Sequence, residues 1–434
     1  MRHVVDGWFA RAMTAPLEKM RHGRLVLHDP SGTRTFGDEA APAATMHVHD
    51  ARFFTRVALG GEIGLGESYM DGDWSTPDLV RLVRVMLANQ DCIPTMSGPA
   101  TWLSRLRDAN VNTWRNTRAG SRRNIRRHYD LGNDFFKLFL DANLLYSCAV
   151  YDRPDDSLET AQVNKLRLIC DKLDLSPNDH VLEIGTGWGG FALFAATRYG
   201  CRVTTTTISA EQHAHAARLV AGAGAAGARI DLRFEDYRDL RGRFDKIVSI
   251  EMFEAVGWRH YDDFFAACDR LLAPDGLMLL QTITVDDARF HAYRRTPSWM
   301  AKYIFPGAEL ASLAEMLASL ARVSQLRLYH AQDIGTHYAR TLRQWRERFF
   351  LRLDAVRAQG FDERFIRMWD LYLAYCEAAF LERHIGDVQL LLTRTATRRV
   401  LFDEPWAVQR VRNTATADEA SVEVQRAESI EAAR

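Results

Sequence analysis

Strand-like and helical patterns alternate along residues 170–394, and this alternation constrains the fold of the chain more than any other feature. The strand-like runs are short, apolar and rich in β-branched residues, and helical patterns separate most of them. They lie at 180–184, 202–208, 230–234, 244–250, 276–284, 324–330 and 388–393. Such repetition predicts the α/β class, with a doubly wound, Rossmann-like domain whose mainly parallel sheet carries helices on both faces.

The first 100 residues follow another pattern and predict a small α+β unit of their own, since 434 residues suffice for two domains. Alternating apolar runs at 23–28 and 44–49 indicate strands, and the apolar spacing of 79–87 indicates a helix. The glycine-punctuated stretch 60–72 is interpreted as a loop.

Residues 101–128 connect this unit to the second predicted domain, 129–412, and they are strongly basic. Tryptophan and leucine side chains stand between the arginines of this connector. Two interpretations remain open, a solvated linker helix or a surface that meets anionic lipid head groups. An aromatic insertion is expected at 285–320, and the polar tail 413–434 is expected to be disordered.

Composition excludes several classes of protein. Lys+Arg and Asp+Glu number 56 each, so no excess positive charge points to nucleic acid as a partner. The six cysteines form no C-x-x-C pair, and their spacing predicts neither a metal site nor a disulfide framework but reduced thiols in the cytoplasm. No apolar run is long enough for a signal sequence or a membrane span. A lipid substrate would therefore be reached peripherally, from the inner face of the membrane.

The clearest chemical motif is the run VLEIGTGWGG at 181–190, an apolar strand that leads into a glycine-rich turn. Glycines let the backbone approach a ligand closely, and ligands of such sheets bind at the carboxyl ends of the strands. The Gly-Lys-Ser/Thr of a phosphate-binding P-loop is absent, whereas a dinucleotide site or a tight turn without ligand stays open. Glu183, two residues before the first glycine, favours S-adenosylmethionine, because the cofactor's sulfonium and ammonium charges attract a carboxylate.

The ends of the next two strand-like runs carry further candidate cofactor residues. Gln212 follows the second run, and Asp236 and Tyr237 follow the third. An acidic residue and an aromatic ring at this place could bind an adenine amino group and stack on its face. Without the glycine motif, Asp236 would be interpreted as a turn residue and Tyr237 as a packing ring.

Several motifs together resemble the cyclopropane-fatty-acyl-phospholipid synthases and the mycolic acid cyclopropane synthases. They are GLGESYMDG (64–72), RHYDLGNDFF (127–136), YSCA (146–149), the glycine-rich turn, TISAEQ (207–212), MFEAVG (252–257) and YIFPG (303–307). The match covers almost the whole chain except the tail, and the combination is far more specific than any one motif.

The resemblance implies that residues 1–100 form an N-terminal domain that engages lipid. It also implies a methyltransferase domain that transfers a methylene group from S-adenosylmethionine to the cis double bond of a phospholipid acyl chain. It carries cofactor binding over to Tyr146, Ser147, Gly185, Thr186, Gly187, Trp188, Gly189, Thr207, Ile208, Gln212, Asp236 and Tyr237. The insertion would form the acyl pocket with Phe290, Tyr293, Trp299, Met300, Tyr303 and Phe305. A homodimer is also a family expectation.

The same resemblance implies that a bound bicarbonate ion acts as the base. Its pocket would be formed by Cys148, Glu254, Ile283 and Tyr338. Gln281 departs from the family, in which many members have a histidine, and glutamine carries no proton at neutral pH. The departure puts in doubt the base chemistry and ring closure. Cys376 occupies a position considered as a nucleophile in the family, but the mechanism needs no thiolate, and a structural role is expected.

Three alternatives remain open at this point. The first is an enzyme of the same architecture that gives a methyl or methylidene branch, which Gln281 keeps in consideration. The second is a catalytically inactive protein that binds cofactor and lipid. The third is a methyltransferase for a small soluble molecule, against which the N-terminal unit, the basic connector and the aromatic insertion argue.

Overall fold

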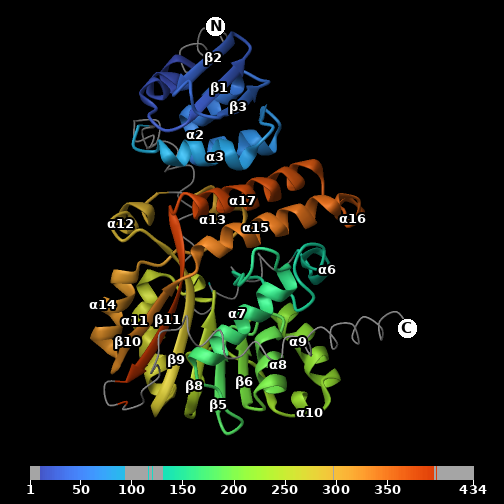
Figure 1. The fold of residues 1–434 in the computed structure, drawn as a ribbon, viewed down its shortest axis with the longest axis vertical. Coiled ribbons are helices and arrows are strands. Elements are labelled where there is room, and N and C mark those ends of the chain that lie inside the picture. The colour runs from blue at the N-terminus through green and yellow to red at the C-terminus, as the bar shows by residue number, and fades with distance from the viewer. Residues whose placement is uncertain are drawn as a thin grey trace. The chain divides into compact units, whose positions relative to one another are not determined.

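The structure is a computed structural model that describes residues 10–92, 116, 120, 131–296, 298–394 and 397. Nearly all of the predicted connector 101–128, and the whole tail 413–434, lie outside the described residues. The described strands form two sheets, one of four strands near the N-terminus and one of seven strands in the remainder (Figure 1). Among the described residues, no helix is both long and apolar enough to cross a membrane.

The smaller sheet has the order β2-β1-β3-β4 and confirms the strands predicted near the N-terminus. Its strands are β1 (Arg24–Asp29), β2 (Gly32–Gly37), β3 (Ala43–Val48) and β4 (Trp74–Ser75), and its helices are η1 (Ala15–Lys19), α2 (Arg52–Met70) and α3 (Leu79–Ala88). Alternate residues such as Leu25, Leu27 and Met46 are buried, as expected for strands with one face on a core.

The expectation of a loop at 60–72 is wrong, because α2 runs through most of this stretch. Gly61 interrupts the helix with φ 55° and ψ −136°, a conformation that favours glycine. A Cβ at Gly66 would overlap the ring of Trp299, and a Cβ at Gly64 would overlap the carbonyl oxygen of Arg56. At these two positions glycine permits close packing of the helix and does not mark a loop.

The larger sheet confirms all seven predicted strands and has the order β10-β11-β9-β8-β5-β6-β7. The strands are β5 (His180–Ile184), β6 (Arg202–Thr207), β7 (Ile230–Phe234), β8 (Phe244–Ile250), β9 (Leu272–Val285), β10 (Leu326–Asp333) and β11 (Ile385–Arg394). Strands β5 to β9 run parallel, and β11 is antiparallel to both of its neighbours. Consecutive residues of central strands, such as Met278 and Leu279, are fully buried, so both faces of the sheet are covered.

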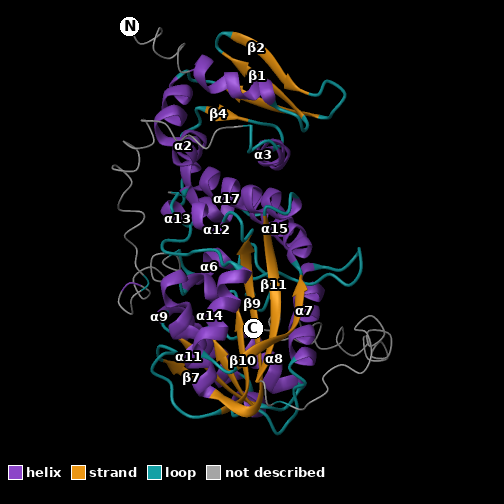
Figure 2. Ribbon diagram, turned by 90° about the vertical axis from the view of Figure 1, so that its left-hand side faces the viewer, coloured by secondary structure: helices purple, strands orange, loops and turns teal. Residues whose placement is uncertain are grey.

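Helices precede or follow most of these strands (Figures 1 and 2). Their bounds are α6 (Asn133–Phe136), α7 (Leu158–Lys172), α8 (Gly190–Arg198), α9 (Ala210–Gly222), α10 (Gly224–Gly227), η3 (Phe253–Ala255), η4 (Trp258–His260), α11 (Tyr261–Leu271), α12 (Phe290–Tyr293), α13 (Trp299–Tyr303), α14 (Leu313–Val323), α15 (Gly335–Leu351), α16 (Leu353–Ala358) and α17 (Glu363–Leu381). Helices α8 and α9 contact β6 and β7, whereas α14 contacts α11 and β10.

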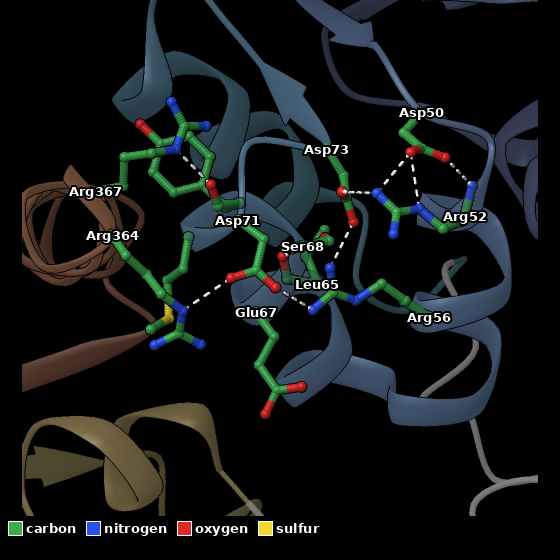
Figure 3. Close-up of polar contacts among 12 residues, drawn as sticks. Asp50, Arg52, Arg56, Leu65, Glu67, Ser68, Asp71, Asp73, Arg364 and Arg367 are labelled. Carbon is green, nitrogen blue, oxygen red and sulfur yellow. Dashed lines mark hydrogen bonds and ion pairs between the residues drawn. The ribbon is translucent and has the colours of Figure 1, made fainter.

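Helix α17 ties the N-terminal sheet and its helices to the larger sheet, because it packs on α2, α3 and α15. Arg364 Nε donates to Asp71 Oδ1 at 2.8 Å, and the Arg367 guanidinium donates to the backbone carbonyl of Tyr69 (Figure 3). The Tyr69 hydroxyl donates in turn to Asp370 Oδ2 at 2.7 Å. The end of α2 is therefore held against α17 by polar contacts that range from exposed to buried, as well as by apolar packing.

Candidate active site

A cavity of 1510 Å³ begins at the carboxyl ends of β5, β6, β7 and β8 and extends into the N-terminal region. Its polar end is lined by the glycine-rich turn and by the residues that follow the strands. Its apolar end is lined by side chains of the N-terminal sheet and of α2, among them Leu25, Leu27, Met46, Phe53 and Phe54. The polar end is where α/β sheets of this kind bind their ligands.

The glycine-rich turn adopts backbone conformations that explain its composition. Gly185, Gly187 and Gly189 have φ angles of 103°, 54° and 97°, which side chains with a Cβ rarely adopt. The backbone N–H groups of Gly185 and Thr186 donate to the carbonyl of Thr206 at 3.1 Å each, which fixes the turn against β6. The turn thus exposes its backbone to the cavity immediately before α8 begins.

Glu183 is buried at the end of β5 and lines the polar end of the cavity. Thr205 Oγ1 donates to its Oε2 at 2.5 Å. Burial raises the pKa of Glu183 to about 8, although the hydrogen bond from Thr205 and the charge of Lys165 act in the opposite direction. A cation placed beside this carboxylate would favour its ionised form.

The acidic and aromatic residues after β7 lie where the sequence predicted them, at the edge of the cavity. The Asp236 carboxylate accepts two hydrogen bonds from Arg238, from Nε at 2.8 Å and from Nη2 at 2.7 Å. The Tyr237 ring meets Phe264 edge to face, with 5.4 Å between the ring centroids. Asp236 is thus held in one orientation beside a ring that is itself fixed by packing.

All predicted cofactor residues except Gly189 line the cavity. Gly189 instead takes the left-handed conformation that begins α8. Of the other predicted site residues, Glu254, Ile283, Tyr338 and Cys376 line the cavity, whereas Cys148 and Gln281 are fully buried beside it.

Glu251 lies at the centre of the predicted catalytic residues, although the sequence analysis did not single it out. Its Oε1 accepts from the backbone N–H of Cys148 at 2.8 Å and from Nε2 of Gln281 at 2.8 Å. Its Oε2 accepts from the Tyr338 hydroxyl at 2.5 Å. Three donors from three separate parts of the chain therefore converge on one half-buried carboxylate that lines the cavity.

These donors include two of the residues that the family resemblance assigned to bicarbonate. Because the Cys148 N–H and the Tyr338 hydroxyl already bind the carboxylate of Glu251, the residues present do not fit a bound bicarbonate ion. The sequence offered one signal for Glu251, its position directly after β8 at the carboxyl edge of the sheet. The motif MFEAVG begins at Met252, one residue after Glu251, and so does not include it.

The side chain of Glu254 is a second carboxylate near Glu251. Its Oε1 accepts from Thr282 Oγ1 at 2.9 Å and from the backbone N–H of Ile283 at 2.6 Å. Its Oε2 is buried and has no hydrogen-bond partner among the described residues. Burial and then the neighbouring charge of Glu251 raise the pKa of Glu254 to about 7.

Gln281 connects Glu251 to a buried polar network behind the cavity. Its Nε2 also donates to Asp387 Oδ2 at 3.1 Å, and its Oε1 accepts from Gln389 at 3.0 Å. Burial raises the pKa of Asp387 well above its usual range, and the charge of Glu251 raises it further. Gln281 therefore positions Glu251, and Asp387 is a second residue of the site that no motif indicated.

Lys165 of α7 is a third residue that the sequence analysis missed. It is fully buried, lines the cavity, and donates from Nζ to the Ser147 hydroxyl at 2.6 Å. Burial lowers its pKa, while the carboxylates of Glu251 and Asp141 raise it. A buried lysine among these carboxylates partly compensates their negative charge, and an isolated lysine in a helical pattern gives no sign of this role.

The two cysteines at the site are neutral thiols near neutral pH. Burial raises the pKa of Cys148 well above its usual range, and the charges of Asp387 and Glu251 add to this effect. Burial alone raises the pKa of Cys376 to about 12. Neither side chain is therefore poised as a thiolate nucleophile.

Several aromatic rings line the cavity. The hydroxyls of Tyr146 and Tyr372 are 2.8 Å apart, and Tyr338 stacks on Phe380 with 4.6 Å between ring centroids. Of the six insertion residues predicted to form the acyl pocket, three line the cavity, namely Tyr293, Met300 and Phe305. The other three do not: Phe290 is fully buried, Trp299 covers Gly66, and Tyr303 donates to Glu67.

Comparison with known proteins gives a consistent result. The family model described as mycolic acid cyclopropane synthetase matches residues 116–390. Tuberculostearic acid methyltransferase UfaA1 of Mycobacterium tuberculosis is 40% identical over 379 residues, which cover 86% of this chain and 87% of the relative. Cyclopropane-fatty-acyl-phospholipid synthase of Escherichia coli K12 is 39% identical over 361 residues, 82% of this chain and 89% of the relative.

A solved structure gives the same result in three dimensions. Mycolic acid cyclopropane synthase CmaA1, complexed with SAH and CTAB, superposes with a TM-score of 0.58 at 32% sequence identity. The superposition covers 63% of this chain and 98% of that structure.

Proposed function

We propose, because this chain belongs to the mycolic acid cyclopropane synthetase family, that it transfers the methyl group of S-adenosylmethionine to a double-bond carbon of an unsaturated acyl chain. One observation carries the proposal: a single cavity joins the glycine-rich turn to an apolar space lined by the N-terminal region. The cavity volume of 1510 Å³ exceeds the roughly 300–1,000 Å³ of a site for one drug-sized ligand. The cavity therefore has room for a nucleoside and an acyl chain at the same time.

The polar end of the cavity fits S-adenosylmethionine, which supplies an electrophilic methyl group on its sulfonium when bound. The buried carboxylate of Glu183 suits a nearby positive charge, and the open backbone of the glycine-rich turn permits close approach. Asp236 and Tyr237 offer an acceptor and a ring face at the next strand end. The protein's part is to hold the two reactants in a dry space at close distance, since an alkene is a poor nucleophile.

Addition of the methyl group leaves positive charge on the neighbouring carbon of the acyl chain. The aromatic rings of Tyr146, Phe305 and Tyr338 line the cavity and can stabilise this charge through their faces. Loss of a proton from the new methyl group with closure of a ring then gives a cyclopropane, our first candidate product. No step passes through bicarbonate, because its predicted donors bind Glu251.

A methylidene branch is the second candidate product, and Gln281 is the observation that favours it. Gln281 is part of a fixed hydrogen-bond network and carries no titrating proton, so ring closure through a histidine at this place is excluded. A hydride shift before the proton leaves the new methyl group would give the branch. The relative of 40% identity is named as a methyltransferase, and the one of 39% as a cyclopropane synthase, so identity does not choose between the products.

We also propose phospholipid acyl chains as the substrate class, reached peripherally at the inner face of the membrane from the cytoplasm. The apolar end of the cavity supports a lipid over a small soluble molecule. The homodimer and the lack of a nucleic-acid partner stay predictions of the sequence.

Mass spectrometry of acyl chains tests the proposal, after purified protein is incubated with S-adenosylmethionine and monounsaturated phospholipid vesicles. A chain heavier by one CH₂ that no longer reacts as an alkene supports the cyclopropane. The same gain with an alkene still present supports the methylidene branch. No gain on monounsaturated or polyunsaturated lipid overturns the proposed function and favours an inactive cofactor-binding protein or a soluble substrate.

A further inference from the structure

We infer that the carboxylate of Glu251 takes the place that the family resemblance assigns to a bicarbonate ion, and that Glu251 is the base of the reaction. The inference rests on the proposed function and deepens it. It makes the base part of the chain, so that catalysis needs no anion from solution.

The hydrogen bonds of Glu251 are those of a bound anion. Both carboxylate oxygens accept strong donors, Oε1 from the Cys148 N–H and Gln281, and Oε2 from the Tyr338 hydroxyl. A bicarbonate ion presents the same pair of oxygens on one carbon, so the two anions compete for one set of donors. Since the glutamate is covalently attached beside its donors, it is present there at every turnover.

The backbone of Glu251 gives a second, independent observation. Its φ angle is 48°, in the left-handed region that favours glycine and is uncommon for residues with a Cβ. The backbone N–H of Glu251 donates to the Gln281 carbonyl at 2.8 Å, which fixes this conformation at the end of β8. A glutamate held in a conformation suited to glycine indicates that its side chain has a function, because such strain gathers at functional sites.

Two other acids, Asp387 and Glu254, lie near Glu251. Of the three, Glu251 is the one that accepts hydrogen bonds from the Cys148 N–H and the Tyr338 hydroxyl. Burial and the charge of Glu251 raise the pKa of Asp387 well above its usual range, and they raise that of Glu254 to about 7. Asp387 is fully buried and does not line the cavity, whereas Glu251 lines it. An acyl chain bound in the cavity can therefore meet Glu251 but not Asp387.

The proton transfer balances without another reactant. Methyl transfer breaks the sulfur–carbon bond and forms a carbon–carbon bond, which leaves a carbocation on the acyl chain. A C–H bond of the new methyl group then breaks. Its electron pair forms the ring bond, or the double bond of a methylidene branch after a hydride shift, and the proton passes to a carboxylate oxygen of Glu251. Release of this proton to water restores the carboxylate.

Two substitutions at this position test the inference in buffer freed of carbon dioxide and in buffer with added bicarbonate. Glu251→Gly keeps the left-handed backbone and opens the space in front of Cys148 and Tyr338. We expect it to lose roughly 10²-fold or more in kcat without bicarbonate and to recover at least a tenth of wild-type kcat when bicarbonate is added. Glu251→Gln fills the same space without a basic oxygen, so we expect the same loss and no recovery.

Wild type and the exposed-site control Glu347→Gln on α15 should show equal kcat with and without bicarbonate. S-adenosylhomocysteine affinity, measured by calorimetry, should stay within about threefold of wild type in every variant, which shows that the variants are folded. A wild-type enzyme that needs added bicarbonate, or an active Glu251→Gln variant, overturns the inference about Glu251 but not the proposed function. A wild-type protein that methylates no acyl chain overturns the proposed function, and the inference with it.

Discussion

Single side chains at this site owe their chemistry to their surroundings, and Glu183 is the clearest case. The carboxylate has a pKa of about 8 because it is buried, so it holds a proton near neutral pH when no cation is near. A positively charged cofactor reverses the preference and favours the ionised form. Binding of S-adenosylmethionine should therefore be coupled to the release of a proton.

This coupling sets the pH dependence of cofactor affinity. Because the free protein carries the extra proton below a pKa of about 8, affinity should rise as pH increases from 6 and level off above 8. Calorimetry at pH 7 in two buffers of different ionisation enthalpy should detect release of up to one proton. In Glu183→Gln the proton release should vanish, and affinity should fall about 10- to 100-fold with the lost charge-assisted interaction. Equal proton release in wild type and variant would contradict the assignment.

Substitution of Tyr338 tests how much the hydrogen bonds to Glu251 contribute to kcat. Tyr338→Phe removes the 2.5 Å hydrogen bond to Glu251 and keeps the ring that stacks on Phe380. The loss of a hydrogen bond to a charged group predicts a kcat about 10- to 100-fold lower, with cofactor affinity unchanged. Steady-state kinetics with unsaturated phospholipid vesicles would measure the change, with Tyr329→Phe as the control, since Tyr329 on β10 is 37% exposed. A changed KM for S-adenosylmethionine with normal kcat would assign Tyr338 to cofactor binding instead.

The site residues divide into those that a motif can indicate and those that only the fold brings together. Glu183 stands at the end of a strand-like run that leads into a glycine-rich turn, so its pattern suggests its place, whereas Glu254 and Tyr338 were indicated by the family resemblance. Glu251 receives its meaning from Cys148, Gln281 and Tyr338, which come from positions 87 to 103 residues away or on another strand. No local pattern reports such convergence, because it depends on the order of strands in the sheet.

At the scale of elements, period and propensity predicted the strands better than the glycine-rich helix. Central strands of the larger sheet, such as β5 and β8, are short apolar runs buried on both faces, which is the simplest pattern to identify. Helix α2 contains four glycines between positions 60 and 66, a composition that local propensity assigns to a loop. Tertiary packing overrides that propensity, because Gly66 gives room to Trp299 of α13.

Gly66→Ala should therefore destabilise the fold at this contact. The added Cβ overlaps the Trp299 ring, and overpacking of this kind costs about 1–3 kcal/mol in the free energy of unfolding. Chemical denaturation would measure the difference. Gly222→Ala at the end of α9 is the matched control, since a Cβ there meets nothing within 4 Å, and its effect should stay below about 1 kcal/mol. Equal stability of both variants would show that α2 tolerates movement away from α13.

At the scale of the whole molecule, the cavity is the feature that no stretch of sequence could indicate. Its lining runs from Ala12 to Ile385 and joins the smaller sheet, α2 and the larger sheet. Contacts such as Arg364 with Asp71 and Tyr69 with Asp370 hold the N-terminal part of this lining against α17. The N-terminal region therefore has a role in the cavity itself, in addition to the role at the lipid surface that the sequence suggested.

If the acyl chain extends into this part of the cavity, filling it should select for shorter chains. Ala58 lies on α2 and lines the cavity, so Ala58→Phe reduces the space far in sequence from Glu183 and the glycine-rich turn. We expect kcat/KM for an 18-carbon chain to fall about tenfold relative to a 14-carbon chain, because even one methylene that no longer fits a hydrophobic pocket costs about 1–3 kcal/mol. Affinity for S-adenosylhomocysteine should stay unchanged, which separates a shortened acyl site from a misfolded protein.

Ala88→Phe on α3 is the matched control for this change, since Ala88 is exposed and does not line the cavity. It adds the same side chain to the N-terminal region and should leave the ratio between the two chain lengths as in wild type. An Ala58→Phe enzyme with the wild-type ratio would place the acyl chain elsewhere, along the wall formed by the insertion and α17. In that case Met300→Trp should shorten the preferred chain instead, because Met300 lines the cavity on that side.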